Sequence, residues 1–187
     1  MRDSAVPPPV TQVMESAGDW LPARLGEVEA RLAEITKGHG PELGGEAEAT
    51  LAAGGKRLRP LLVLICAGAE AQRALGAAVA VELVHMATLV HDDVLDGAPV
   101  RRGRPTVVAR AGREAAVGVG DLLFSRAFAE LAASSGADAV AELGSASVAL
   151  ARGELAQRRD AYDTAIGEER YFHRCSLKTA RLFESAC

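Results

Sequence analysis

The chain has 187 residues, of which 49% are hydrophobic and 25% charged, with 25 acidic residues against 21 Lys and Arg. This length and apolar content suit one globular domain or part of one. They exclude disorder over the whole chain, because enough apolar surface is present to offset the ordering entropy. The formal charge of −4 argues against a general nucleic-acid-binding protein, which needs a basic surface to displace phosphate counterions.

The first segment of the chain and its cysteines predict a cytoplasmic protein. The N-terminal sequence has no apolar region typical of a signal peptide, and no later stretch of about 18 residues is free of charge, so no transmembrane segment is expected. Cys66, Cys175 and Cys187 lack the spacing of a disulfide or zinc framework. We expect them to be buried, reduced thiols.

The first elements in chain order are a tail and two helices. Residues 1–9 are rich in proline and are expected to be a disordered tail, whereas residues 10–187 belong to one helical domain. Leu25, Val28, Leu32 and Ile35 recur at spacings of three and four, which predicts a helix over 22–37 with one apolar face. A second helix is expected over 41–53, where two glycines stop it.

The rest of the chain is also predicted to be helical. Ala, Leu and Glu dominate it, and the alternation of β-branched and aromatic residues expected of strands is missing. We predict helices over 60–70, 72–96, 113–134, 137–159 and 167–186. The predicted fold class is all-α, and abundant small side chains favour a compact bundle.

Three carboxylates follow two apolar turns of the helix predicted over 72–96. Asp92 and Asp96 are one helical turn apart, so they leave the same face, with Asp93 beside them. Like charges at this spacing repel, and acids at a helix C-terminus oppose the helix dipole. Bound Mg²⁺ would relieve both penalties, because it prefers oxygen ligands and commonly joins carboxylates to substrate phosphates. A solvated acidic helix end is the alternative.

Basic segments lie on both sides of these acids. Residues 54–60 read Gly-Gly-Lys-Arg-Leu-Arg-Pro, residues 101–106 read Arg-Arg-Gly-Arg-Pro-Thr, and Lys178 follows on a later helix. Taken alone, the first segment fits a solvated surface turn. Together the segments suggest two bound polyanions, since Arg and Lys match phosphate oxygens. Two diphosphates, one of them metal-bound, would satisfy this arrangement.

Seven motifs of the chain resemble those of the trans-isoprenyl diphosphate synthases, the polyprenyl synthetase family. They occur in the family's order over residues 54–187, and together they are highly specific, whereas each alone is weak. The motifs are Gly-Gly-Lys56-Arg57-Leu-Arg59-Pro, Val-Glu82-Leu-Val-His85, His91-Asp92-Asp93-Val-Leu-Asp96, Arg101-Arg102-Gly-Arg-Pro-Thr, Gly120-Asp121-Leu-Leu-Phe, Gly153-Glu154-Leu-Ala-Gln157 and Lys178-Thr179-Ala. The resemblance implies an isoprenoid-synthase-type helical bundle, of which this chain is the N-terminal part.

The resemblance assigns one group of residues to an allylic diphosphate. Asp92, Asp93 and Asp96 are expected to bind the Mg²⁺ ions that hold this substrate, and Asp92 and Asp96 thereby to act in catalysis. Arg101 is expected to contact the same diphosphate.

A second group is assigned to isopentenyl diphosphate. Lys56, Arg59, His85 and Arg102 are expected to hold its diphosphate, and Gln157 is counted among the substrate-binding residues. His85 lies seven residues before Asp92, hence on the same face of the helix two turns away.

The implied reaction is head-to-tail, trans prenyl transfer. Mg²⁺ and the cations would stabilise the departing diphosphate, the allylic cation would be attacked by isopentenyl diphosphate, and an apolar cavity would exclude water. Lys178 and Thr179 are expected to face the reacting carbon. Small side chains at Ala87 and Thr88, ahead of the acids, predict a product of C20 or longer, and Glu154 with Gln157 also resembles long-chain members.

The chain departs from the family in lacking a second Asp-rich motif, so half of the expected metal site is absent from it. We expect a fragment of a longer homodimeric enzyme, with a split subunit that needs a partner as the alternative. A noncatalytic, diphosphate-binding subunit of a heteromeric prenyl synthase is the competing function. A class I terpene cyclase fits less well, because Lys56, Arg59 and Arg102 would then have no second diphosphate to bind.

Overall fold

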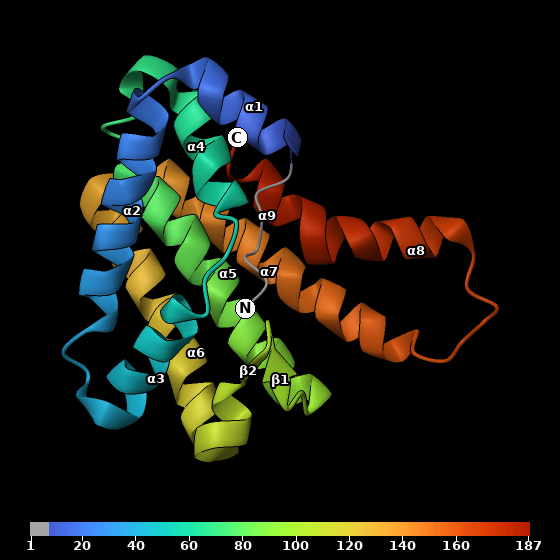
Figure 1. Cartoon of the computed structure of the whole chain (residues 1–187). Helices are drawn as coiled ribbons and strands as arrows, with labels where there is room; N and C mark the ends of the chain where they lie inside the picture. The colour runs from blue at the N-terminus through green and yellow to red at the C-terminus, as the bar shows by residue number, and fades with distance from the viewer. Residues whose placement is uncertain (1–7) are drawn as a thin grey trace.

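The computed structural model describes residues 8–187, which form a bundle of helices around one central helix (Figure 1). The elements are α1 (Pro8–Ala17), α2 (Trp20–Thr36), α3 (Gly40–Ala52), α4 (Leu58–Ala67), the 3-10 turn η1 (Gly68–Glu70), α5 (Leu75–Asp96), β1 (Val100–Arg101), β2 (Arg104–Pro105), α6 (Val107–Ser134), α7 (Ala137–Arg159), α8 (Glu168–Cys175), the π-helical turn η2 (Ser176–Ala180) and α9 (Arg181–Glu184). The all-α prediction is confirmed.

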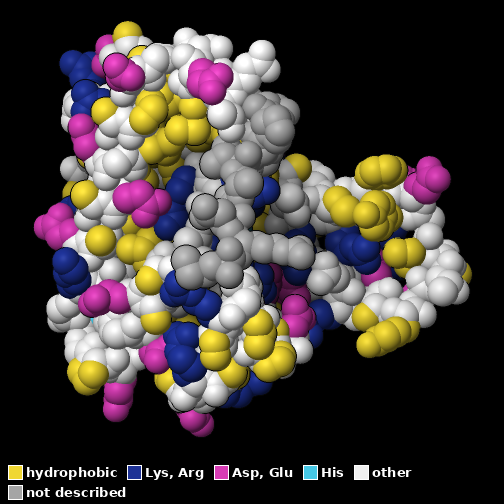
Figure 2. All heavy atoms as spheres, in the orientation of Figure 1, with side chains coloured by type: hydrophobic (Ala, Val, Ile, Leu, Met, Phe, Trp, Pro, Cys, Tyr) yellow, Lys and Arg dark blue, Asp and Glu magenta, His cyan; other side chains and the backbone are white. Residues whose placement is uncertain are grey.

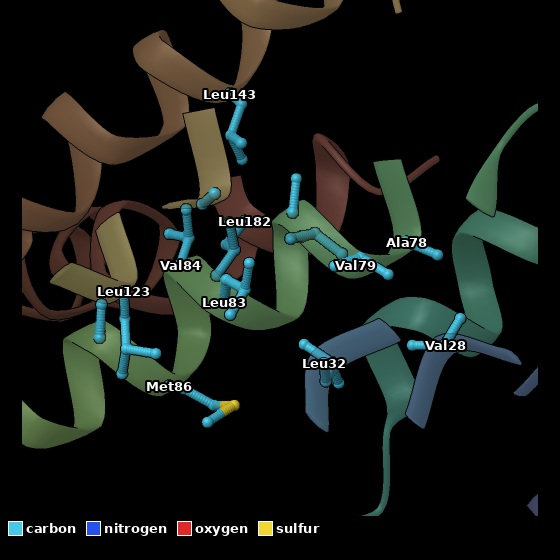
Figure 3. Close-up of a cluster of buried hydrophobic side chains, with 14 of the residues drawn as sticks. Val28, Leu32, Ala78, Val79, Leu83, Val84, Met86, Leu123, Leu143 and Leu182 are labelled. Carbon is cyan, nitrogen blue, oxygen red and sulfur yellow. The ribbon is translucent and has the colours of Figure 1, made fainter. Parts of the chain in front are cut away.

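Helix α5 forms the centre of the bundle. Thirteen of its 22 residues are buried, and it packs against α2, α4, α6 and α7. Figure 3 shows its side chains in one buried cluster with Leu32 of α2, Leu123 of α6 and Leu182 of α9. By length and hydropathy α5 is apolar enough to cross a membrane, but 61% of its most apolar window is buried inside the protein. Its composition therefore fits a core helix.

The spacing-based predictions place most helices within a few residues of their observed bounds, and the differences are local. Residues 1–7 of the expected tail lie outside the described residues, and α1 begins at Pro8. Helix α6 begins at Val107, before the predicted start, and bends at Gly112, where φ is +87°. The basic segment after α5 forms an antiparallel hairpin in which Val100 pairs with Pro105 and Arg101 with Arg104.

The expectation of buried cysteines is wrong, because none of the three is fully buried. Cys66 and Cys187 are exposed and Cys175 is half-buried, although all three are free thiols. Helix α4 buries Leu61, Val63 and Leu64, and Cys66 lies outside this buried set. An apolar neighbourhood in the sequence therefore does not fix which face of α4 a given residue occupies.

Helices α7 and α8 project together from one side of the bundle (Figure 1). The turn between them is held by Asp160, whose buried carboxylate lies 2.5 Å from Arg170 and 3.4 Å from Arg174. Hydrophobic side chains gather on this projection (Figure 2), where Tyr162 and Phe172 are exposed. The ion pairs bring η2, which follows α8, back against α7.

Candidate active site

Two acids at the end of α5 form the first part of the site. The helix stops at Gly97, whose φ of +60° suits glycine. Lys178 lies with its Nζ 3.8 Å from Asp92 Oδ2 and also pairs with Glu154. Arg158 Nη2 lies 3.1 Å from Asp96 Oδ1. Asp92 and Asp96 are thus both faced by cations from η2 and α7, elements more than 50 residues away in the sequence.

Asp93 points away from this pair. Its side chain is buried, and Arg101 donates from Nε to both carboxylate oxygens, at 2.9 and 3.0 Å. Arg101 stands on the hairpin strand β1, which follows α5 directly. The three acids expected to act together therefore separate in space: Asp92 and Asp96 face α7, whereas Asp93 anchors the basic hairpin.

Burial and the neighbouring acids disfavour the ionised form of Asp92, despite the cation that faces it. Burial raises the pKa of Asp92 to about 6, with Glu154 and Asp96 contributing in the same direction and Lys178 opposing them. At pH 7 the Asp92 carboxylate is therefore mostly ionised, but its ionisation costs more free energy than in water, and a further cation nearby would reduce this cost.

The donor set near these acids suits a hard divalent cation. Carboxylate oxygens are the ligands that Mg²⁺ prefers. Lys178 and Arg158 lie beside Asp92 and Asp96, which indicates that this end of α5 attracts positive charge. Within residues 8–187, no three His, Cys, Asp or Glu side chains are close enough to enclose a metal. A cation bound here would take its remaining ligands from water or substrate, as is common for Mg²⁺.

A basic cleft lies beside Asp93, between α3, α5 and the hairpin. It is lined by Arg57, Glu82, His85, Arg101 and Arg102, among others. Arg57 Nη1 lies 2.9 Å from Glu82 Oε1, which is buried within α5. Asp93 also lines the cleft, so five arginines (Arg57, Arg101, Arg102, Arg104 and Arg110) stand against two buried carboxylates, and the excess of positive charge suits an anion.

The backbone of this cleft is unusual at two arginines. Arg57 has φ of +48° and Arg102 has φ of +52°, in the left-handed region that non-glycine residues rarely adopt. Gly55 packs so closely on them that a Cβ there would lie 2.8 Å from Arg57 Nη1 and 3.1 Å from Arg102 Nη1. Such conformations concentrate at functional sites.

His85 on α5 and Arg59 on α4 are two further groups near the basic cleft. Burial, together with the positive charges of Arg59, Arg102, Arg57 and Arg101, lowers the pKa of His85 to about 3, so the imidazole is neutral at pH 7. Arg59 lies over the ring of Phe183 at 4.2 Å, and its buried Nε has no hydrogen-bond partner among the described residues.

Among residues 8–187, three expected site residues form no side-chain hydrogen bond or ion pair with these clusters. Lys56 is exposed in the turn before α4, Thr179 is exposed in η2, and Gln157 is half-buried on α7. Lys178 reaches the acids because η2 approaches α7 closely. A Cβ added at Gly153 of α7 would lie 2.5 Å from the backbone nitrogen of Lys178. This explains the glycine of the Gly153–Gln157 motif.

Sequence reasoning missed three contacts within the candidate site. Glu82 was part of a motif without a role, although an acid inside an apolar stretch of helix signals a buried partner. Glu154 and Arg158 are one turn apart on α7, with Arg158 Nε 3.2 Å from Glu154 Oε1. Their spacing could have indicated the pair, but the approach of Arg158 to Asp96 depends on the packing of α7.

Comparisons with known proteins agree with this geometry. The family model described as Polyprenyl synthetase matches residues 41–187. The chain is 39% identical over 171 residues to heptaprenyl diphosphate synthase component 2 of Geobacillus stearothermophilus, covering 90% of this chain and 53% of that protein. It is 42% identical over 137 residues to the octaprenyl diphosphate synthase of Escherichia coli, covering 71% and 42%.

The structural relatives define the class of fold. A decaprenyl diphosphate synthase from Rhodobacter capsulatus superimposes with a TM-score of 0.82 at 34% identity, over 89% of this chain and 52% of that one. The fold is therefore that of the isoprenyl diphosphate synthases. The chain belongs to the polyprenyl synthetase family, and it spans about half the length of the curated relatives it matches.

Proposed function

We propose that this chain supplies the first half of a trans-prenyltransferase active site, which extends an allylic diphosphate with isopentenyl diphosphate to a product of C20 or longer. The observation that carries the proposal is the division of α5 into two charged sites. Asp92 and Asp96 form an acidic site beside α7, and a basic cleft lies on the other side of Asp93. A reaction between two diphosphates would use both sites, with the metal-bound diphosphate at the acidic site and the other in the basic cleft.

In this proposal Asp92 and Asp96 hold Mg²⁺, which as a Lewis acid would assist departure of the allylic diphosphate. Lys178 stands within 3.8 Å of Asp92 and would stabilise negative charge on the leaving group, while Thr179 faces the reacting carbon. Asp93, expected as a third ligand, is engaged by Arg101. We infer that it orients this arginine toward the allylic diphosphate.

The basic cleft would bind isopentenyl diphosphate. Arg102 lines it, and neutral His85 can donate a hydrogen bond to a phosphate oxygen. The Nε of Arg59, which has no hydrogen-bond partner within residues 8–187, offers a further donor. Lys56 and Gln157 would reach this substrate from exposed and half-buried positions. Anion binding here would compensate the mutual repulsion of the arginines.

A long product is supported by the small residues ahead of the acids. Ala87 is fully buried and Thr88 is half-buried, with its hydroxyl donating to the carbonyl of His85 at 2.7 Å. None of Val84, Ala87 and Thr88 on α5 carries an aromatic ring. The relatives named heptaprenyl and octaprenyl diphosphate synthases agree with this inference.

The partners of the chain belong to the proposal as well. A homodimer is our first expectation, and a heteromer in which another chain supplies the second Asp-rich motif is the alternative. Two relatives carry the name heptaprenyl diphosphate synthase component 2, which favours considering the heteromer. Three free thiols fit the cytoplasmic location that we propose.

The test is incorporation of radiolabelled isopentenyl diphosphate with allylic primers of increasing size, with and without Mg²⁺. The chain is assayed alone and with a polypeptide that carries a second Asp-rich helix. We expect Mg²⁺-dependent extension in the complete system and its loss in Asp92→Asn/Asp96→Asn. Undiminished turnover of that double variant, or turnover without any divalent ion, would refute the proposal. Diphosphate binding without extension in the complete system would favour the noncatalytic subunit.

A further inference from the structure

Arg158 occupies a position that the proposed reaction does not explain. It lies in the last turn of α7, one helical turn after Glu154. Its guanidinium bridges two carboxylates: Nε lies 3.2 Å from Glu154 Oε1, and Nη2 lies 3.1 Å from Asp96 Oδ1. One arginine thus joins α7 to the acidic end of α5.

The two carboxylates that Arg158 bridges differ in their exposure to solvent. Glu154 is 13% exposed and lies one helical turn from Arg158, whereas Asp96 is 52% exposed and is reached across the bundle. Exposed ion pairs contribute little, because water screens them and two side chains must be ordered. The contact with Asp96 is a hydrogen bond, but it is the more solvent-screened of the two, so it can open while the ion pair with Glu154 keeps the guanidinium near the site.

The charges around Asp96 explain why a cation stands there. Asp92 and Asp96 repel each other at one-turn spacing, and both lie at the C-terminal end of α5, where the helix dipole is unfavourable to acids. Lys178 faces Asp92, and among residues 8–187 Arg158 is the cation paired with Asp96. A divalent ion would carry twice the charge and approach the oxygen more closely than a guanidinium.

We propose that Arg158 is a built-in counter-ion that occupies Asp96 until a divalent cation binds, and that it thereby sets the cation concentration at which the site fills. This inference rests on the proposed function, since it takes Asp92 and Asp96 as the cation ligands. Arg158 acts through Asp96 and is a positioning residue. Binding of the ion opens the contact with Asp96, and the guanidinium stays on Glu154.

The test measures Mn²⁺ binding to the 187-residue chain by the electron paramagnetic resonance signal of the free ion, without substrate or turnover. Arg158→Leu is expected to bind Mn²⁺ roughly three- to fivefold more tightly, as suits loss of one partly exposed competing pair. Arg159→Leu is the matched control. It removes the same charge from the neighbouring exposed residue, which makes no ion pair among the described residues, and its affinity should change less than twofold.

A double-mutant cycle identifies the carboxylate involved. In an Asp96→Asn background, Arg158→Leu should no longer tighten Mn²⁺ binding, because the competing contact is already gone. Equal affinities for Arg158→Leu and Arg159→Leu would overturn the inference, as would a gain that persists in Asp96→Asn. Far-UV circular dichroism checks that each variant keeps the helical content of the parent.

Failure of the inference and failure of the proposed function give different results. If Asp92→Asn/Asp96→Asn abolishes Mn²⁺ binding while Arg158→Leu binds like the parent chain, only the role of Arg158 is refuted. If Mn²⁺ binding is absent, or is unchanged in Asp92→Asn/Asp96→Asn, the acidic site itself is refuted and the counter-ion with it.

Discussion

Replacing Asp92 by Asn should stabilise the folded chain while removing a proposed metal ligand. The side chain of Asp92 is 23% exposed, and it lies near Glu154 and Asp96. Burial and these acids raise its pKa from 3.8 to about 6. An isosteric amide keeps the volume and loses the charge, so the penalty for holding an anion there disappears.

The magnitude follows from the pKa. One pKa unit corresponds to about 1.4 kcal/mol, so the rise to about 6 corresponds to about 3 kcal/mol against the ionised folded state. The amide must also be accommodated, and the side chain is partly solvated. We therefore expect a gain of about 1–2 kcal/mol in the free energy of unfolding, or roughly 3–6 °C in Tm for a chain of this size.

The gain should depend on pH in a defined direction. Because the pKa of Asp92 is higher in the folded state, the folded chain binds more protons between about pH 4 and pH 6, and stability falls as pH rises through this window. The penalty is complete above about pH 6 and absent below about pH 4. Asp92→Asn should therefore be most stabilising at pH 8 and nearly neutral at pH 4.

The assay is urea unfolding followed by circular dichroism at pH 8 and at pH 4, without divalent ions. Asp163→Asn, in the exposed turn after α7, is the control and should change the free energy of unfolding by less than about 0.5 kcal/mol at either pH. A destabilised Asp92→Asn at pH 8, or an equal gain at both pH values, would refute the reasoning.

Three further predictions test the close contacts and the proposed product. Gly153→Ala should destabilise the chain by about 1–3 kcal/mol in urea unfolding, because the new Cβ meets the backbone of Lys178 at 2.5 Å; Gly144→Ala, on the same helix with open space around it, should be neutral or stabilising by up to about 1 kcal/mol. Equal effects at the two glycines would contradict the close approach. Glu82→Gln should cost about 1–3 kcal/mol by the same measurement, because Arg57 loses its buried carboxylate partner and keeps only the exposed Glu29; a neutral result would argue against the buried pair. Ala87→Phe in an active form of the protein should shorten the prenyl product seen by chromatography, and an unchanged chain length would count against a channel along α5.

The helices could be predicted because their periodicity is local. Leu25, Val28, Leu32 and Ile35 already define the packed face of α2, and the buried residues Val28, Leu32 and Ile35 confirm it. The start of α6 was missed, since Gly112 carries a positive φ that interrupts the helical spacing. The exposure of Cys66 was missed for another reason: it depends on which neighbours cover α4, and no local pattern encodes this.

The candidate site was predictable in its residue types but only partly in its contacts. One-turn spacing brought Asp92 and Asp96 together, and motif order brought Lys178 into the site; their proximity is observed. The sequence grouped Asp93 with them, whereas the hairpin places Arg101 against it. That separation depends on where β1 folds back, and this is a tertiary property.

The left-handed backbone at Arg102 has a consequence for how this site can vary. Glycine adopts such a conformation without steric penalty, whereas a β-branched residue is strongly disfavoured. Substitution by glycine would relax the hairpin and remove a guanidinium in the same step. At this one position, a mutation that relaxes the backbone would therefore also remove a cation from the proposed anion site.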